Sequence, residues 1–211
     1  MSYQNANGDD IMKLSFKARF MGHFFHNALK PEYKTRNIPK SAVSDIAKEH
    51  KLIAARAKDM NDEKLLASYL MGIYFIAMNR HTGLDAEENY KMLENALRSS
   101  KTFKNGLGSA EDYLDEKNMP MRMKWSEESH KRRNENNWVV DVLPKCAEYD
   151  LGYDYHECGI CKICKDEGCF ELAKYLCRLD YVIADMMDAK LVRTKTIAEG
   201  SDMCDFRYSL K

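Results

Sequence analysis

The stretch Trp138-Val139-Val140-Asp141-Val142-Leu143-Pro144 marks the point where the chain changes character. Its β-branched residues predict a strand, which Pro144 ends because proline cannot donate a ladder hydrogen bond. Downstream of it, strands are expected near 149–155, 191–197 and 203–209, and helices at 159–167 and 170–187. This part of the chain is therefore predicted to form a small antiparallel sheet with two helices.

Upstream of Trp138 the apolar residues recur with the period of a helix. Helices are expected from a cap at Asp9-Asp10 to Lys30-Pro31, from Ile38-Pro39 to Ile53, from an N-cap at Asn61 to His81-Thr82-Gly83, and from Asp85 through Leu97. The signal fades after residue 101, and His130-Lys131-Arg132-Arg133 is predicted to be a solvated helix face. The fold class is therefore predicted to be α+β, with a helix-rich region over 1–137 and an α+β region over 138–211 in one compact domain.

The composition indicates a soluble, globular chain. Hydrophobic residues make up 45% of the 211, which is enough for a core. The 33 basic and 33 acidic residues give a net charge of zero, so neither nucleic acid nor an anionic membrane is an expected partner. The polar N-terminus has no apolar signal region, and the longest apolar stretch, Leu65 to Met78, is too short to cross a bilayer. We therefore expect a cytoplasmic protein with a small-molecule substrate.

Two sequence patterns, one of apolar residues and one of histidines, are interpreted as packing features. The stretch Leu65–Met78 is apolar nearly all round, so it is expected at the centre of the core or in a homodimer interface. His23 and His26 form an i, i+3 pair on the first expected helix, among aromatic and methionine residues, and are predicted to belong to a packed aromatic face. Neither pattern predicts a catalytic site.

The seven cysteines are expected to be thiols, metal ligands or catalysts rather than disulfides. The run Cys158-Gly-Ile-Cys161-Lys-Ile-Cys164, with Cys169 after it, approaches a bacterial ferredoxin motif, but it has one residue too many and Phe170 in place of proline. A zinc site built from His156 and three of these cysteines would be crowded. Iron–sulfur, zinc and ordinary buried thiols remain as alternatives for this run.

Cys177 shares a helix face with Asp180, three residues later. A carboxylate beside a thiol raises the pKa of the thiol unless a cation lies between them. The pair therefore needs a basic third member to form a thiolate, and Arg193 or Arg207 is expected to come from the sheet.

Three cysteine-bearing elements together resemble a known family. They are Cys158 ten residues before Gly168, then Cys177-Arg-Leu-Asp180, and finally Gly200-Ser-Asp-Met-Cys204-Asp205-Phe206-Arg207. In order and spacing they resemble the C-terminal signature of the L-2-amino-thiazoline-4-carboxylic acid hydrolase-like family. Cys161, Cys164 and Cys169 have no counterpart in that signature.

The resemblance implies hydrolysis of a cyclic amidine, in which a thiazoline ring opens to an N-carbamoyl cysteine without a cofactor. Cys158 is the first choice of nucleophile, because the dipole of the helix it begins would lower its pKa. Cys177 and Cys204 complete the expected site, with Asp180 or Asp205 as general acid or base. Arg207 or Arg193 would bind the substrate carboxylate.

A second interpretation is a metal- or ligand-binding module. The C-terminal sequence also resembles vinyl-reductase-type and phenol-sensor domains, in which late cysteines hold a zinc ion beside a hydrophobic pocket. Under this interpretation Cys158, Cys177 and Cys204 are metal ligands, with His156 or Glu199 as the fourth. The cofactor would then be zinc or an iron–sulfur centre.

Overall fold

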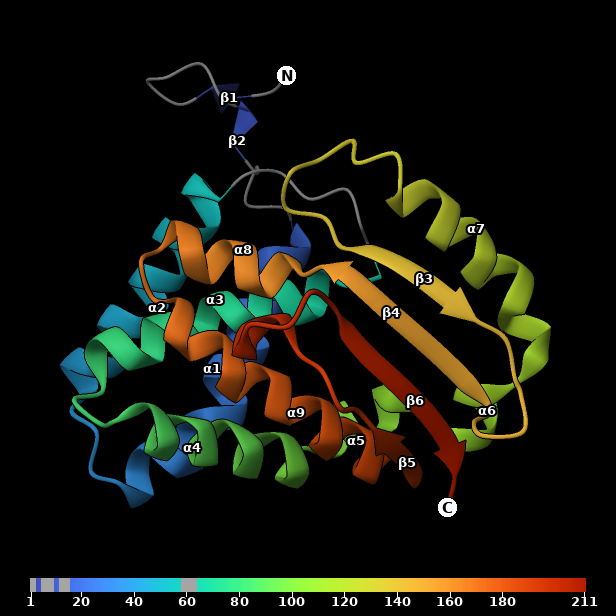
Figure 1. Ribbon diagram of the computed structural model, residues 1–211. Helices are drawn as coiled ribbons and strands as arrows, with labels where there is room; N and C mark the ends of the chain where they lie inside the picture. Colours follow the sequence, from blue (N-terminus) through green and yellow to red (C-terminus); the bar gives the residue numbers. More distant parts are fainter. Residues whose placement is uncertain (1–2, 5–9, 12–15, 58–63) are drawn as a thin grey trace.

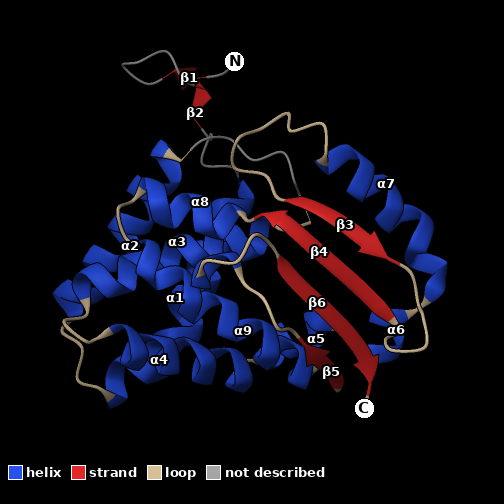
Figure 2. Cartoon of the chain, in the orientation of Figure 1, coloured by secondary structure: helices blue, strands red, loops and turns tan. Residues whose placement is uncertain are grey.

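The computed structural model describes residues 3–4, 10–11, 16–57 and 64–211. It confirms the α+β class: helices dominate the first part, and a four-stranded antiparallel sheet in the order β3-β4-β6-β5 forms in the last third. Figures 1 and 2 show helices covering one face of this sheet. Within the described residues, no helix is long and apolar enough to span a membrane.

The N-terminal helices pack around one buried helix. They are α1 (Phe16–Thr35), α2 (Lys40–Arg56), α3 (Leu66–His81) and α4 (Ala86–Ser99). Every residue of α3 from Tyr69 to Met78 is buried, so its apolar surface is accounted for by the centre of the core. The hydrophobic core also includes residues of the C-terminal part, such as Trp138 and Leu179.

The first helix differs from its prediction at both ends. The predicted end at Lys30-Pro31 is wrong, because α1 runs through Pro31 to Thr35. Proline removes one helical hydrogen bond, and the last turn gains the burial of Tyr33, whose hydroxyl lies 3.3 Å from that of Tyr74. Asp10 does not cap this helix either, because it lies in β2 (Asp10–Ile11), which pairs with β1 (Tyr3–Gln4). The predicted caps at Asp9 and Asn61 lie outside the described residues.

The stretch with a weak sequence signal contains three helices, α5 (Lys101–Leu107), α6 (Ala110–Leu114) and α7 (Met119–Ser129), and a 3₁₀ turn at Glu116–Asn118. Side chains of Ser100 and Ser109 cap α5 and α6. Helix α7 packs on the outer strand, where Ser126 Oγ donates to the carbonyl of Val140 at 2.8 Å. The predicted helical setting of residues 130–133 is wrong: α7 ends at Ser129, and these exposed residues follow in a turn and loop.

The sheet contains β3 (Val139–Leu143), β4 (Leu151–Glu157), β5 (Ala189–Val192) and β6 (Cys204–Leu210). The register places Tyr155 opposite Cys204 and Tyr153 opposite Phe206, so these four side chains share one face. That face looks toward the helices. Strand β5 is shorter than the strand predicted over 191–197, because the chain leaves β5 after Val192 and passes through a 3₁₀ turn at Ile197–Glu199.

Both C-terminal helices are confirmed. Helix α8 (Gly159–Asp166) follows β4 directly, and α9 (Ala173–Met186) follows a 3₁₀ turn at Phe170–Leu172. Helix α9 packs beside β5 at the end of the sheet (Figure 1). The short β4–α8 and α9–β5 connections hold the helices against the inner face of the sheet, and this is where the predicted cysteines gather.

Candidate functional site

A cavity of about 370 Å³ lies between the inner face of the sheet and helices α1, α3, α5 and α9. We call it the cysteine cavity, because Cys158, Cys177 and Cys204 all line it. Asp180 and Arg193 line it as well. The structure therefore brings together five of the seven residues that the sequence assigned to catalysis and substrate binding.

Cys158 stands at the N-cap of α8, at the point where β4 ends and the helix begins. The chain passes very close to Trp138 and Asn136 at this point, which requires glycine at position 159. A Cβ added at Gly159 would lie 2.6 Å from the ring of Trp138 and 2.5 Å from the carbonyl oxygen of Asn136. Only glycine fits so close to another backbone and ring. The sulfur therefore stands where the first amides of α8 point toward it.

The surroundings of Cys158 favour its thiolate. The Cys161 thiol lowers the pKa of Cys158 most, and the backbone amides of Cys161 and Ile160 lower it further, although the sulfur forms no regular capping hydrogen bond. Burial and the carboxylate of Asp180 act in the opposite direction. The net effect is a lowered pKa, as expected for a cysteine at a helix N-terminus.

The other two cysteines of the cavity remain protonated. Burial, and then the nearby Asp180 carboxylate, raise the pKa of Cys177 far above its usual range. Burial also raises the pKa of Cys204 to about 11, although its sulfur accepts a hydrogen bond from the backbone N–H of Ile197 at 3.2 Å. Because a thiolate is the nucleophilic form, the three cysteines are not chemically equivalent.

Asp180 and Arg193 form an ion pair inside the cavity. The Arg193 Nη1 lies 2.7 Å from Asp180 Oδ2, and its Nη2 donates to the carbonyl of Cys177 at 2.9 Å. Burial raises the pKa of Asp180 to about 6, even though Arg193 acts to lower it. A carboxyl group with a pKa near neutrality can both donate and accept a proton at physiological pH.

Arg193 is the most deeply buried charge of the site. Its side chain is 4% exposed, and its guanidinium lies over the rings of Phe206 at 4.8 Å and Tyr181 at 5.0 Å. The Nε atom has no hydrogen-bond partner among the described residues. An unpaired donor at a buried cation is costly, so this Nε is available to an acceptor.

Three tyrosines of the site were not expected from the sequence. Tyr113, Tyr155 and Tyr208 line the cavity, and burial raises the pKa of each well above its usual value. They are therefore neutral hydroxyl donors. For Tyr155 and Tyr208 the available signal was strand alternation, which places them on the face of Cys204. Tyr113 comes from α6, which no sequence pattern predicted.

The structure does not bring Asp205 or Arg207 to the cavity. Both alternate with Cys204 along β6 and therefore lie on the outer face of the sheet. Asp205 accepts hydrogen bonds from the backbone N–H of Thr194 at 2.8 Å and from its hydroxyl at 2.6 Å. Arg207 pairs with Asp154 at 2.7 Å. In this arrangement Asp205 stabilises the loop after β5, and Arg207 links β6 to β4 through its ion pair with Asp154.

The additional metal ligands considered also lie elsewhere. His156 is exposed on the outer face, where its Nε2 lies 2.8 Å from Asp141 Oδ2. Glu199 accepts a hydrogen bond from Thr196 Oγ1 at 2.7 Å. Over the parts of the chain that the structure describes, no three His, Cys, Asp or Glu side chains are arranged to hold a metal ion. The residues present therefore do not fit the zinc set proposed from the sequence.

The remaining cysteines do not form a single cluster. Cys161 and Cys164 are buried on α8, and Cys161 interacts with Cys158 whereas Cys164 interacts with Cys169. Cys146 is exposed in the loop between β3 and β4. The Cys158–Cys164 run therefore divides into two dithiol pairs, of which only one reaches the cysteine cavity.

Comparison with known proteins identifies a family. The family model described as L-2-amino-thiazoline-4-carboxylic acid hydrolase matches residues 63–208, a segment that includes every residue of the site except Met21 and Phe25 of α1. No curated protein matches the chain, and no solved structure matches it.

Proposed function

The chain belongs to the L-2-amino-thiazoline-4-carboxylic acid hydrolase family, and from this premise we propose that it hydrolyses a cyclic amidine, or a related C–N or C–S bond, of a small carboxylate. The observation that carries the proposal is the position of Cys158. Its thiol has a lowered pKa and lines a cavity that also holds a carboxyl group with a pKa of about 6. These are the two groups that covalent hydrolysis requires.

The proposed reaction has two steps, written here for a 2-amino-thiazoline ring. The Cys158 thiolate attacks C2, the C–S bond of the ring breaks, and Asp180 in its protonated form delivers a proton to the departing sulfur. The product of this step is an S-linked amidine on Cys158. Asp180 is now ionised and takes a proton from a water molecule while the oxygen of that water attacks the same carbon. The Cys158 thiolate then leaves. The net change is the addition of one water molecule, which yields an N-carbamoyl cysteine.

Arg193 is proposed to bind the substrate carboxylate through its unpaired Nε. Its burial over Phe206 strengthens such an interaction, because charges attract more strongly where water is excluded. The neutral tyrosines Tyr155 and Tyr208, which line the cavity, are proposed to donate to the developing negative charge. Cys177 and Cys204, as protonated thiols, contribute shape and weak hydrogen bonds rather than nucleophilic attack.

The size of the cavity bears on the substrate. A cavity of about 150 Å³ holds benzene, and the cysteine cavity is more than twice that volume at about 370 Å³. Its lining also includes apolar side chains such as Phe25, Met71 and Phe103. A substrate with an apolar arm attached to the ring therefore fits this cavity better than a bare thiazoline carboxylate.

The test is direct turnover. Purified protein is incubated with L-2-amino-thiazoline-4-carboxylate and with analogues that carry an apolar arm, and the hydrated product is followed by mass spectrometry and by its free thiol. We expect turnover by the native chain and by Arg207→Met, and none by Cys158→Ser. Cys204→Ser, matched in chemistry and in the same cavity, is expected to retain activity within about tenfold.

Two outcomes would contradict the proposal. Undiminished ring opening by Cys158→Ser would remove Cys158 as nucleophile. Tight binding of the ring compounds without turnover, by the native chain and by Cys158→Ser alike, would instead favour a ligand-binding module.

A further inference from the structure

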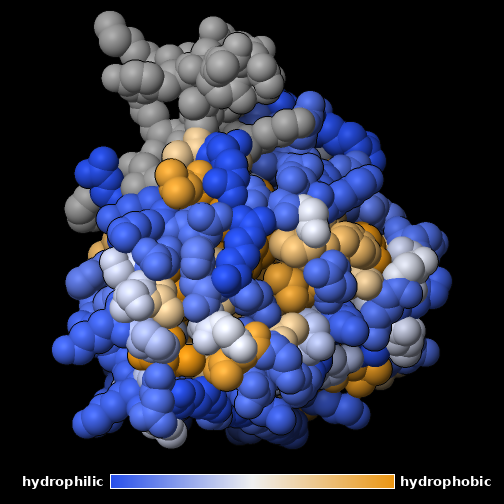
Figure 3. Space-filling model, turned by 90° about the vertical axis from the view of Figure 1, so that its left-hand side faces the viewer, coloured by the Kyte–Doolittle hydropathy of each residue, from blue (hydrophilic) through white to orange (hydrophobic). Residues whose placement is uncertain are grey.

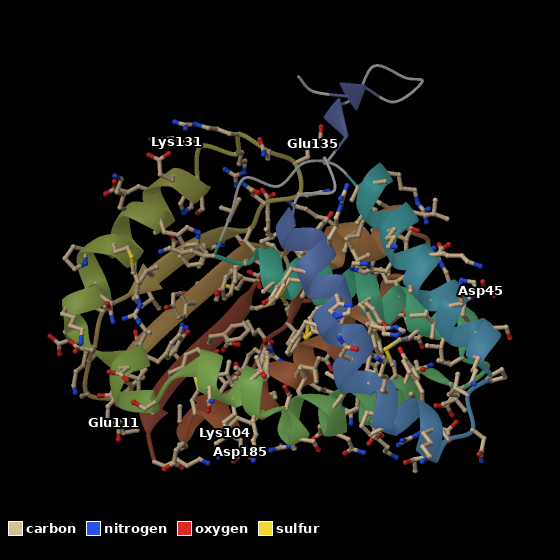
Figure 4. All side chains as sticks on the ribbon, turned by 180° about the vertical axis from the view of Figure 1, so that it is seen from behind. Asp45, Lys104, Glu111, Lys131, Glu135 and Asp185 are labelled. Carbon is tan, nitrogen blue, oxygen red and sulfur yellow. The ribbon has the colours of Figure 1, made fainter. Side chains whose placement is uncertain are left out.

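A second cavity lies on the opposite side of α1. It has a volume of about 600 Å³ and is lined by Arg19, Gly22, His23 and His26 of α1, Ala47, His50 and Lys51 of α2, and Tyr74 of α3. We call it the histidine cavity. Figure 4, seen from behind, shows α1 and α2 lying side by side there, away from the sheet, with Asp45 marking α2. Met21 and Phe25, also on α1, face the cysteine cavity instead.

A buried imidazole with an unsatisfied nitrogen lines the histidine cavity. His50 is 3% exposed, its ring centroid lies 5.3 Å from that of Tyr74, and its Nε2 has no hydrogen-bond partner among the described residues. Leaving such a buried polar atom unpaired costs about 1–3 kcal/mol. A ligand atom in the cavity would remove that cost.

Glycine at position 22 lets α1 pack closely against this imidazole. A Cβ at Gly22 would lie 2.7 Å from Cε1 and 2.9 Å from Nδ1 of His50. Any other residue would therefore press a side chain against the ring and fill the space beside it. Gly22, the only glycine of α1, therefore lies directly against the His50 ring.

His26 supplies a second unsatisfied nitrogen in the same cavity. Its Nδ1 is buried without a hydrogen-bond partner among the residues described. Burial, with Lys30 and His23 nearby, lowers the pKa of His26, and burial with Lys51 lowers that of His50 to about 4. Both rings are therefore neutral near pH 7, and each neutral ring carries one N–H donor.

The charges that line the histidine cavity favour an anionic ligand over a cationic one. Arg19 and Lys51 are exposed at the rim, and no acidic side chain lines the histidine cavity within the described residues. A cationic ligand would be repelled, and no three donor side chains in the described part of the chain are arranged for a metal ion. An oxyanion matches both the rim cations and the imidazole donors.

We propose that the histidine cavity binds an organic oxyanion, that is, a carboxylate or phosphate group attached to an apolar body. The oxyanion lies between Arg19 and Lys51 and accepts from the His50 imidazole, and the apolar body packs on Tyr74 and Ala47. The volume supports an organic ligand rather than an inorganic ion, because about 150 Å³ already accommodates benzene. This site is separate from the cysteine cavity and does not depend on the hydrolase proposal.

The test uses the full chain and defined probes. Phenylacetate, phenyl phosphate, inorganic phosphate and phenethylammonium are titrated by calorimetry, and the histidine ring signals are followed by NMR. We expect saturable binding of the two aromatic anions with shifts of the His50 and His26 signals, much weaker binding of inorganic phosphate, and none of the ammonium compound. The stronger of the two aromatic anions identifies the headgroup.

Variants separate a built site from general surface charge. Arg19→Gln with Lys51→Gln is expected to weaken anion binding about tenfold or more, whereas Lys48→Gln is expected to leave it unchanged. Lys48 is the matched control because it lies on the same helix, is exposed, and pairs with Asp45 outside the cavity. Gly22→Ala is expected to abolish binding, and its thermal unfolding shows whether the fold survives.

Several results would overturn the proposal. These are the absence of saturable binding by either aromatic anion, equal binding of phenethylammonium, unmoved His50 signals, or equal affinities in the double variant and in Lys48→Gln.

Discussion

Replacement of Arg193 by methionine tests the ion pair at the centre of the cysteine cavity. Arg193 is 4% exposed and lies 2.7 Å from Asp180. Removing one member of a buried pair leaves the other as an unpaired charge, which costs about 3–5 kcal/mol. A third of the Asp180 side chain is accessible, so part of that cost is screened. We therefore expect Arg193→Met to lower the free energy of unfolding by about 2–3 kcal/mol at pH 8.

The loss is expected to depend on pH, with a sign that follows from Asp180. Its pKa is raised from 3.8 to about 6 in the folded protein, so the folded state binds this proton more tightly than the unfolded state. Ionised Asp180 therefore lowers stability above pH 6, and the penalty disappears as the pH falls toward 4. Without Arg193 the pKa of Asp180 rises further, because the arginine acts to lower it. The loss caused by Arg193→Met is consequently expected to shrink between pH 8 and pH 5.

The assay is urea unfolding at pH 8 and pH 5 for four proteins. The control is Arg132→Met, which removes an exposed arginine 2.7 Å from Glu157 and is expected to cost less than about 1 kcal/mol at both pH values, because Glu157 keeps Lys162 as a partner at 2.6 Å. Adding Asp180→Asn to Arg193→Met is expected to restore most of the stability at pH 8. Equal losses at the two pH values, or a loss at pH 8 no larger than that of Arg132→Met, would refute the reasoning.

Three further predictions concern the start of α8. Iodoacetamide at pH 7.5 is expected to modify Cys158 at least about tenfold faster than the other two thiols of the cysteine cavity, measured by peptide mass spectrometry, since alkylation follows the thiolate fraction. Oxidised glutathione is expected to join Cys158 to Cys161 through a mixed disulfide that releases two reduced glutathiones, and Cys161→Ser is expected to stop at the mixed disulfide. Gly159→Ala is expected to lower stability by about 1–3 kcal/mol, whereas Gly106→Ala, where nothing lies within 4 Å of an added Cβ, is expected to be neutral or stabilising; equal thermal shifts would contradict the close approach at Gly159.

The sheet and the long helices could be predicted from the sequence because their signals are local. The β-branched run from Val139 to Val142 and the continuous apolar surface of Tyr69–Met78 each report the burial that the structure shows. The helices between residues 101 and 129 could not, since contacts from distant segments stabilise them. Ala110, for example, is almost fully buried, and its backbone N–H donates to the carbonyl of Met187 at 2.9 Å.

The candidate site could be predicted in part of its membership but not in its geometry. Spacing places Cys177 and Asp180 on one helix face, and of the two arginines expected beside them the structure places Arg193 there, where it pairs with Asp180 while burial keeps Cys177 protonated. Asp205 and Arg207 were assigned by position in a motif, and a motif does not state which face of a strand each residue occupies. Strand alternation, applied from Cys204, separates both of them from the cavity.

The motif also treats its three cysteines alike, and the structure distinguishes them by backbone context. Cys158 precedes a helix, so amides and the Cys161 thiol point at its sulfur and lower its pKa. Cys177 lies inside a helix, where the backbone N–H groups are already bonded, and burial beside Asp180 raises its pKa. Cys204 lies in a strand and receives a single amide, which does not outweigh burial. Because all three sulfurs line one cavity, the difference between their pKa values comes from the immediate partners of each sulfur: the Cys161 thiol and the first amides of α8 for Cys158, burial beside Asp180 for Cys177, and burial with a single amide for Cys204.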